Sequence, residues 1–290
     1  FIMIFEEAYT LTNGVQIPKL ALGTWLIKGA AAKDAVKNAI EIGYRHIDTA
    51  QAYGNEEEVG NGVRESGIRR DDIFITSKVA AENKSYASAL ESIDTSLKTA
   101  KLDFIDLMLI HSPQPWVEVN QSDNRYFEEN KEVWRAMETA LKAGKLRAIG
   151  ISNFQKEDID NITADCTVKP MVNQLLAHIS NTPLELIEYC NQQNILVEAY
   201  SPIAHGEALK NPEIIRIAEK YGVSVAQLCL KYDLQLGMIV LPKTKSPQHM
   251  RENAQLDFEI SGQDMELLKN IEHIKDYGDS SFFPVYGGKL

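Results

Sequence analysis

The sequence contains few cysteines and no segment suited to a membrane. Cys166, Cys190 and Cys229 are far apart in the 290 residues and form no C-x-x-C pair, a pattern typical of reduced thiols in a cytosolic protein. No run approaches the roughly 20 apolar residues that a membrane-spanning helix needs. The first ten residues, FIMIFEEAYT, reach acidic side chains too soon for a secretory signal. These features predict a cytoplasmic protein.

Positive charge is also scarce. The chain has 30 Lys and Arg against 41 Asp and Glu, which gives a formal net charge of −11. Nucleic acids and anionic membrane surfaces are bound by clusters of Lys and Arg. We therefore expect no nucleic-acid partner and no membrane partner. A small anionic ligand stays compatible with this composition, because a local basic pocket can lie within an acidic protein.

Two common site motifs are absent. The six histidines show neither H-E-x-x-H nor another ligand spacing, which predicts that the protein holds no metal. The first predicted strand is followed by GTWLIKGA, whereas an open dinucleotide-binding sheet carries G-x-G-x-x-G at that point. An open, doubly wound sheet is therefore disfavoured.

The sequence does contain a regular alternation of short apolar runs and helical stretches. The runs are apolar on both faces, as a parallel sheet covered by helices requires. Between these runs lie predicted helices, in which apolar residues recur every three or four positions, for example in 33–42, 86–97, 133–143, 183–193 and 213–222. The predicted strands are 19–23, 46–48, 73–77, 104–110, 147–152, 171–174, 195–201 and 238–242.

Eight strand–helix units without a linker favour one α/β domain, an eight-stranded parallel (β/α)8 TIM barrel, over residues 1–290. The hairpin and barrel would occupy residues 10–275, and residues 276–290 would form a C-terminal tail over the barrel mouth. The hairpin, YTLTNGVQI, turns at Asn13-Gly14, a pair that suits a type I′ turn. It would plug the bottom of the barrel.

Four chemically useful side chains stand at or just after the ends of neighbouring strands. Asp48 ends the second strand, Lys78 the third and His111 the fourth, while Tyr53 follows Asp48 in the loop. In a (β/α)8 barrel these loops meet at one mouth, where chemistry takes place. Each residue alone could be a cap, a rim aromatic, a solvated lysine or a buried histidine. All four in equivalent places favour a shared function.

The chemistry of this group suits proton donation to an oxygen atom. A phenol with a pKa of about 10 is a poor acid at neutral pH, but a nearby ammonium such as that of Lys78 lowers that value. Asp48 can hold Lys78, and a neutral His111 can orient a carbonyl oxygen. A capping box of Asn55 and Glu58 would fix the loop that carries the phenol. Carbonyl reduction needs this arrangement together with a hydride source.

Longer motifs in this chain are similar to those of the aldo-keto reductases, in particular the microbial branch that includes diketogluconate- and dicarbonyl-type reductases. The matching motifs are DTAQAYGNEEEVG, FITSK, DFIDLMLIHSP, AIGISNF and LPKTKSPQHMREN, between about residue 10 and about residue 275. The resemblance implies a barrel that binds NADPH extended over its mouth. It also implies that Asp48, Tyr53, Lys78 and His111 are the catalytic tetrad, with Tyr53 as general acid.

The same resemblance implies a set of cofactor contacts. Those expected around the nicotinamide are Gly23, Thr24, Trp25, Asp48, Ser152, Asn153, Gln174 and Tyr200. Those expected along the phosphates and the adenosine are Ser201, Ile203, Lys243, Thr244, His249 and Asn253. The substrate would contact Trp25, Tyr53, His111 and Trp116.

The chain departs from the family pattern at three places. His249 stands where the family usually has an Arg against the 2′-phosphate, and an imidazole does not replace a permanently charged guanidinium. NADH is therefore a possible second cofactor. Ser112 stands where many members have a Trp, and the short segment 201–214 implies an open site.

The sequence thus predicts NADPH-dependent reduction of aldehydes and ketones to alcohols. The substrate would be a small carbonyl, a dicarbonyl or a sugar-like ketoacid. A Schiff-base lyase that uses Lys78 as nucleophile is an alternative, and so is a non-catalytic barrel that only holds nucleotide. The oligomeric state is left open, with a monomer as one possibility.

Overall fold

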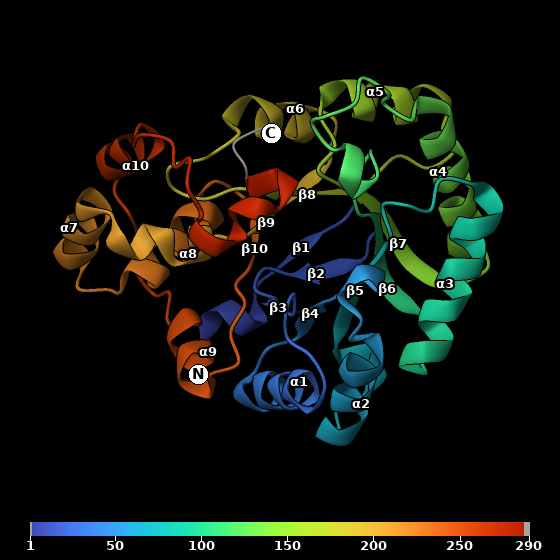
Figure 1. Cartoon of the computed structure of the whole chain (residues 1–290). Coiled ribbons are helices and arrows are strands. Elements are labelled where there is room, and N and C mark those ends of the chain that lie inside the picture. The colour runs from blue at the N-terminus through green and yellow to red at the C-terminus, as the bar shows by residue number, and fades with distance from the viewer. Residues whose placement is uncertain (1, 287–290) are drawn as a thin grey trace.

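A ring of parallel strands forms the centre of the protein. The structure, a computed structural model, describes residues 2–286. Within these residues, eight strands form one sheet in the order β10-β9-β8-β7-β6-β5-β4-β3. The ring closes between its two ends, where Gly23 N donates to Pro242 O at 3.0 Å and Val240 N donates to Lys19 O at 3.0 Å. Helices surround the strands (Figure 1). The predicted (β/α)8 barrel is confirmed.

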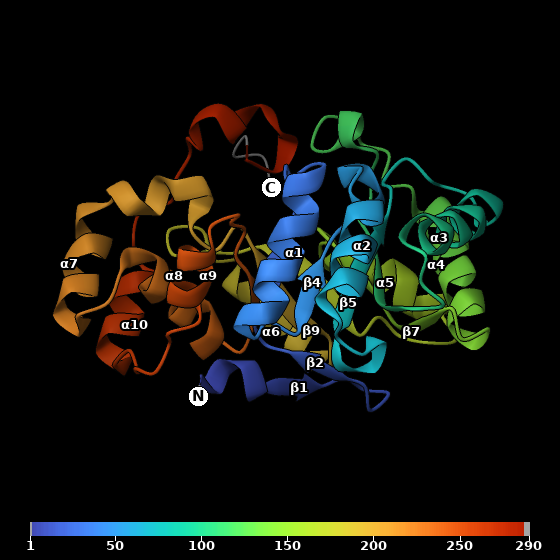
Figure 2. The same ribbon diagram turned by 90° about the horizontal axis from the view of Figure 1, so that it is seen from below.

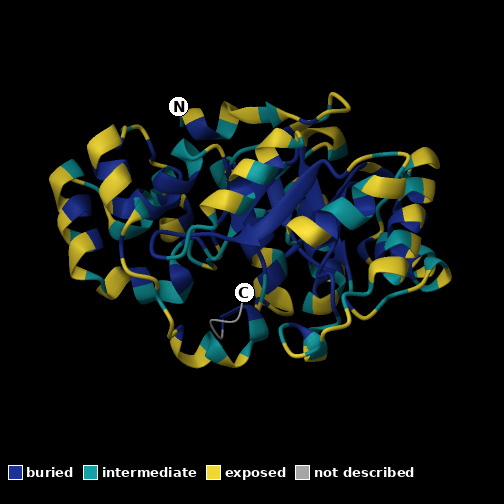
Figure 3. Ribbon diagram, turned by 90° about the horizontal axis from the view of Figure 1, so that it is seen from above, coloured by how far each residue is buried: buried dark blue, intermediate teal, exposed yellow. Residues whose placement is uncertain are grey.

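The strands are short and buried on both faces. All six residues of β5 and all six of β6 are buried, because side chains on one face fill the barrel and those on the other pack under the helices. Figure 3 shows this buried centre inside a largely exposed outer layer. The bounds are β3 Leu22–Gly23, β4 His46–Asp48, β5 Phe74–Val79, β6 Ile105–Ile110, β7 Leu146–Ser152, β8 Val172–Leu176, β9 Leu196–Tyr200 and β10 Ile239–Leu241.

The helices each bury one apolar side against the strands. In α1, for example, Ala32, Ala35, Val36, Ala39 and Ile40 are buried at three- and four-residue spacing. The bounds are α1 Ala30–Ile42, α2 Glu56–Ser66, α3 Tyr86–Ala100, α4 Phe127–Lys142, α5 Lys156–Asp165, α6 Leu184–Gln192, α7 Pro212–Tyr221, α8 Val225–Gln235, α9 Pro247–Asn253 and α10 Gly262–Lys269. Among residues 2–286 there is no helix with both the length and the apolar character that crossing a membrane requires.

The N-terminal hairpin pairs β1 (Ala8–Thr10) with β2 (Gln16–Pro18). It lies across one end of the barrel (Figure 2), where Ile17 is fully buried in the main core. The predicted type I′ turn is wrong. Gly14 has a φ of 88°, but Asn13 is not among the residues with positive φ. Leu11 N bonds Val15 O and Gly14 N bonds Leu11 O. This is a three-residue loop in which only the glycine needs the left-handed region.

The C-terminal segment lies at the other end of the barrel from the hairpin (Figure 2). It contains two short 3₁₀ helices, Gly278–Phe282 and Pro284–Tyr286. Tyr277, Val285 and Tyr286 are buried there against Leu176 and Ala204. Residues 287–290 of the predicted tail, and residue 1, lie outside the described residues.

Candidate active site

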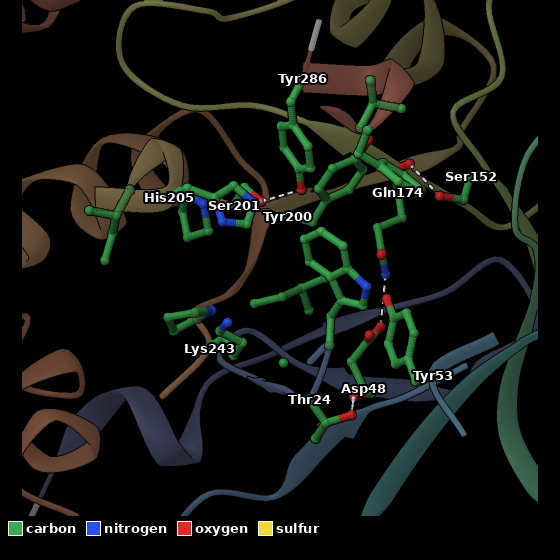
Figure 4. A pocket seen from close by; sticks show the side chains of 18 of the residues that line it. Thr24, Asp48, Tyr53, Ser152, Gln174, Tyr200, Ser201, His205, Lys243 and Tyr286 are labelled. Carbon is green, nitrogen blue, oxygen red and sulfur yellow. Dashed lines mark hydrogen bonds between the residues drawn. The ribbon is translucent and has the colours of Figure 1, made fainter. Parts of the chain in front are cut away.

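A cavity of about 590 Å³ opens where the barrel strands end and the loops to the helices begin. Figure 4 shows side chains from distant parts of the chain, among them Asp48, Gln174 and Tyr286, around this space. Among residues 2–286, no three His, Cys, Asp or Glu side chains are arranged to hold a metal ion. The wall is formed by Gly23, Thr24, Trp25, Asp48, Ala52, Tyr53, His111, Trp116, Ser152, Asn153, Gln174, Tyr200, Ser201, Pro202, Ile203, His205, Gly206, Leu209, Leu241, Pro242, Lys243, Phe283, Val285 and Tyr286.

Lys78 lies beneath this cavity as a fully buried cation, with a side-chain exposure of 0%. Its Nζ donates to Asp48 Oδ1 at 2.6 Å, to the carbonyl oxygen of Thr49 at 2.9 Å and to Tyr53 Oη at 3.2 Å. These bonds use all three hydrogens of an ammonium group. Burial lowers the pKa of Lys78, but Asp48 and Tyr53 raise it by more, so its pKa lies above the usual value. The group is therefore charged at neutral pH.

Tyr53 presents its phenol to the cavity from the 3₁₀ turn Gln51–Tyr53. Burial raises the pKa of this phenol above 10, and the opposing effect of Lys78 does not reverse the rise. Lys78 lowers the phenol's pKa as predicted, but desolvation raises that pKa by more, so the net shift is upward. The phenol therefore keeps its proton at neutral pH. Since Lys78 donates to the phenol oxygen, the phenol's own hydrogen is available to an acceptor in the cavity.

His111 follows β6, and its ring lies 5.7 Å from the Tyr53 ring and 5.0 Å from the Trp116 ring. Burial and then Lys78 lower the pKa of His111 well below its usual value, so the imidazole is neutral. Its Nδ1 is buried without a hydrogen-bond partner among the described residues. A hydrogen on Nε2 avoids an unpaired N–H donor at that buried position. His111 is thus able to donate one hydrogen bond from Nε2 without carrying a charge.

The loop that carries Tyr53 is held by Asn55, but not in the predicted way. The side chain of Asn55 donates to the carbonyl oxygens of Thr24 and Ile27 at 3.0 and 2.9 Å and accepts from Thr49 Oγ1. It makes no cap bond to α2, so the predicted capping box with Glu58 is wrong. The reason is that a fully buried amide needs several partners, and the loop after β3 supplies them. Asn55 thereby joins the first two loops of the mouth.

Residues expected around a nicotinamide are brought together at the ends of β7, β8 and β9. Ser152 Oγ donates to the carbonyl oxygen of Gln174 at 2.9 Å. Asn153, in the left-handed region with a φ of 62°, donates from Nδ2 to His111 O at 3.0 Å. Tyr200 donates from its hydroxyl to Asn153 Oδ1 at 2.5 Å. These bonds fix the wall of the cavity next to His111.

The other expected cofactor residues divide into two groups. Gly23, Thr24, Trp25, Ser201, Ile203 and Lys243 line the cavity. Thr244, His249 and Asn253 are not among its wall residues in the described part of the chain. His249 is exposed in the first turn of α9, where its backbone N donates to Ser246 Oγ at 3.2 Å. Contacts of these three residues with a nucleotide stay predictions.

Several wall residues were not identified in the sequence. His205 packs against Trp25 and Tyr286, with ring centroids 5.5 and 4.5 Å apart. Phe283 lies 4.9 Å from Trp116, and Tyr286 shares a 2.7 Å hydrogen bond with Ser201 Oγ. Phe282, Phe283 and Tyr286 form an aromatic run near the C-terminus, but in a sequence such a run is as typical of packing on the barrel as of a cavity wall.

The donor set of this cavity fits a nicotinamide dinucleotide. Lys243 supplies a cation to the same cavity wall as Ser201 and other residues of the 201–206 loop, and phosphate groups suit such a combination. Tyr200 offers a ring face, and Gln174 and Asn153 offer amides that can meet a carboxamide.

Comparisons with known proteins agree with this fit. The model of the aldo/keto reductase family matches residues 19–273. Glyoxal reductase of Bacillus subtilis is 43% identical over 265 residues, which cover 91% of this chain and 92% of that protein. An aldo/keto reductase from Brucella melitensis has a TM-score of 0.85 and 37% identity, covering 92% of this chain and 99% of that one. A Bombyx mori aldo-keto reductase in complex with NADP has a TM-score of 0.84 and 29% identity, covering 97% and 98%.

The family match covers most of the chain, and the relatives match over nearly their whole length. The chain belongs to the aldo/keto reductase family of oxidoreductases.

Proposed function

We propose that this protein reduces aldehydes or ketones to alcohols with NADPH, and that Tyr53 supplies the proton. The observation that carries the proposal is the buried Lys78 ammonium, which is held by Asp48 and donates to Tyr53 Oη at 3.2 Å. A barrel that only stored nucleotide would not need a buried cation directed at a phenol. When bound, NADPH supplies a hydride to the carbonyl carbon.

Tyr53 acts as the general acid in this proposal. Its phenol is protonated before the reaction, because burial raises its pKa. As negative charge develops on the substrate oxygen, the phenol transfers its proton to that oxygen. The phenolate that remains is stabilised by the hydrogen bond from Lys78, whose charge Asp48 holds in place.

His111 orients the carbonyl group. A neutral imidazole with its hydrogen on Nε2 can donate to the substrate oxygen without competing as an acid. Trp25 and Trp116 form apolar walls of the same cavity. The candidate substrates are a small carbonyl compound, a dicarbonyl or a sugar-like ketoacid. The similarity to glyoxal reductase of Bacillus subtilis favours dicarbonyls within that group.

The cofactor would lie along one side of the cavity. Ser152, Asn153 and Gln174 would bind the carboxamide, and Tyr200 would stack on the nicotinamide ring. Lys243 would contact phosphate. The solved complex of a Bombyx mori relative with NADP supports NADPH as the cofactor. His249 in place of the family's usual Arg leaves NADH as a second possibility, and a cytoplasmic location stays a prediction.

The Schiff-base alternative is disfavoured by the state of Lys78. A lysine nucleophile must be neutral and reach its substrate. The amine of Lys78 has a raised pKa, 0% side-chain exposure and three hydrogen bonds. Borohydride treatment in the presence of a carbonyl substrate should therefore trap no adduct at Lys78.

Tyr53→Phe tests the proposal, because it removes only the phenol oxygen. With NADPH and glyoxal as probes, we expect the wild-type protein to consume NADPH, followed at the nicotinamide absorbance band. We expect the variant to lose about 10²–10⁴-fold in kcat, the range for loss of one positioned acid. NADPH binding, followed by quenching of tryptophan fluorescence, should change little.

A matched control is Tyr9→Phe. Tyr9 lies in the hairpin at the opposite end of the barrel, so its hydroxyl should not affect the reaction. If Tyr53→Phe keeps most of the wild-type kcat, the general-acid assignment is wrong.

A further inference from the structure

One carboxyl group inside the barrel is not used by the proposed chemistry. Glu198 lies in the middle of β9 and is 0% exposed. Its strand partners in the sheet are Gln174 on β8 and Ile239 on β10. Glu198 Oε1 accepts a hydrogen bond from Gln174 Nε2 at 3.2 Å. The second oxygen, Oε2, is buried without a partner among the described residues.

The amide of Gln174 connects Glu198 to the catalytic group. Gln174 Nε2 donates to Asp48 Oδ2 at 2.9 Å as well as to Glu198. Figure 4 shows the bond between Gln174 and Asp48. An amide nitrogen has two hydrogens, so these two acceptors use both of them. Gln174 lines the cavity, and the atom that it has left for a ligand is its carbonyl oxygen, Oε1.

Burial favours the neutral acid form of Glu198 at neutral pH. Lys78, whose charge acts on Glu198, has all three hydrogens bound to Asp48, Thr49 and Tyr53. A second buried carboxylate beside Asp48 would therefore be unpaired, which is costly in a dry interior. Burial, helped by the charge of Asp48, accordingly raises the pKa of Glu198 to about 8.

We propose that Glu198 is a positioning residue for the nicotinamide cofactor. It accepts a hydrogen bond from the second N–H of Gln174 Nε2, so that Gln174 presents only an acceptor to the cavity. This inference rests on the proposed function. A carbonyl oxygen fixed in that way selects a ligand group that donates, such as the NH₂ of a carboxamide. Without Glu198, one amide hydrogen is free, and Gln174 can turn to present a donor instead.

The experiment compares two dinucleotides that differ only at this group. NADP⁺ carries the carboxamide, and its 3-acetylpyridine analogue keeps the carbonyl but has a methyl group in place of NH₂. Dissociation constants of both are measured by quenching of tryptophan fluorescence, for which Trp25 and Trp116 on the cavity wall are reporters. Changes in the rest of the site affect both ligands equally, so the ratio of the two constants isolates the contact.

Two substitutions of Glu198 form a matched pair. Glu198→Gln keeps a carbonyl acceptor for Gln174, whereas Glu198→Leu has a similar size and no acceptor. For the wild-type protein we expect the analogue to bind roughly three- to tenfold more weakly than NADP⁺, as the loss of one hydrogen bond implies. Glu198→Gln should keep that ratio, and Glu198→Leu should bring it to less than about twofold by the same reasoning.

The outcomes separate this inference from the proposed function. A wild-type protein that binds neither dinucleotide would refute both. If the wild type discriminates and Glu198→Leu discriminates equally, the proposed function survives and the positioning role of Glu198 is wrong. The same follows if Glu198→Gln loses discrimination as fully as Glu198→Leu, because an acceptor at this position would then not be what matters.

Discussion

Glu198→Gln should stabilise the protein, and the gain should increase with pH. In the folded protein burial raises the pKa of Glu198 to about 8, from the value of 4.5 for an exposed glutamate. Between pH 4.5 and pH 8 the folded state keeps this proton while the unfolded chain has lost it. Folding must therefore take up a proton, and the free energy of unfolding falls as pH rises through this window. The amide of glutamine has no proton to gain or lose.

The size of the effect follows from the pKa difference. One pKa unit corresponds to about 1.4 kcal/mol, so the advantage of Glu198→Gln should grow by that amount per pH unit above pH 4.5. Between pH 5.5 and pH 7.5 it should increase by about 3 kcal/mol, and at pH 8 it should level off near 5 kcal/mol.

Urea unfolding of both proteins at pH 5.5, 6.5 and 7.5 measures this difference directly. Equal m-values in the two proteins would show that the variant unfolds from the same compact state. Glu272→Gln is the control, because Glu272 is exposed and its substitution should change the free energy of unfolding little. A constant difference between Glu198→Gln and wild type would refute the reasoning: Glu198 would then be ionised in the folded protein, with a counter-cation that the described contacts do not contain.

Two other substitutions test the cation beneath the cavity and the end of the cofactor site. Lys78→Met leaves Asp48 buried without its cation, so the free energy of unfolding in urea should fall by about 3–5 kcal/mol. Tyr53 also loses the charge that lowers its pKa, so the alkaline limit of residual activity should move to higher pH. An unchanged pH–rate profile would mean that Lys78 only holds its neighbours in place. His249→Arg should tighten NADPH binding by roughly tenfold or more, since a charge-assisted hydrogen bond contributes about 1.5–3 kcal/mol, and leave NADH nearly unchanged. Titrations of both cofactors that give the same NADPH-to-NADH ratio in the wild type and in His249→Arg would show that His249 does not face the 2′-phosphate.

The sequence predicts the barrel because its signal is local and repeated. Each strand must be apolar on both faces and each helix on one face. The eight strand–helix units therefore show the same pattern of apolar residues eight times along the sequence. The position of the tetrad follows from the same rule, since Asp48, Lys78 and His111 all stand where a strand ends. Parallel strands place such residues at one mouth without any knowledge of packing.

Other features depend on contacts between distant segments and have no local pattern. Asn55 is followed by Glu58 at the spacing of a capping box, yet its amide bonds the loop after β3, because burial there demands more partners than one helix end supplies. The net pKa of Tyr53 depends on how deeply the phenol is buried as well as on Lys78. Contacts such as that between Tyr286 and Ser201, 85 residues apart, are likewise invisible in the sequence. The one sequence signal for the role of Glu198 is that a charged residue stands in an otherwise apolar predicted strand.

In the described part of the chain, the barrel interior beneath the cavity contains two carboxyl groups, of Asp48 and Glu198, beside the ammonium of Lys78. Lys78 lies between Asp48 and Tyr53, and its third hydrogen is bound to a backbone carbonyl. A second carboxylate there would compete for the charge that is needed to stabilise the phenolate of Tyr53. Since Glu198 is neutral at neutral pH, the ammonium remains directed at the phenol. Glu198 also accepts a hydrogen bond from Gln174 and so holds it in the orientation that suits a carboxamide, which makes both proton donation and cofactor recognition depend on this one residue.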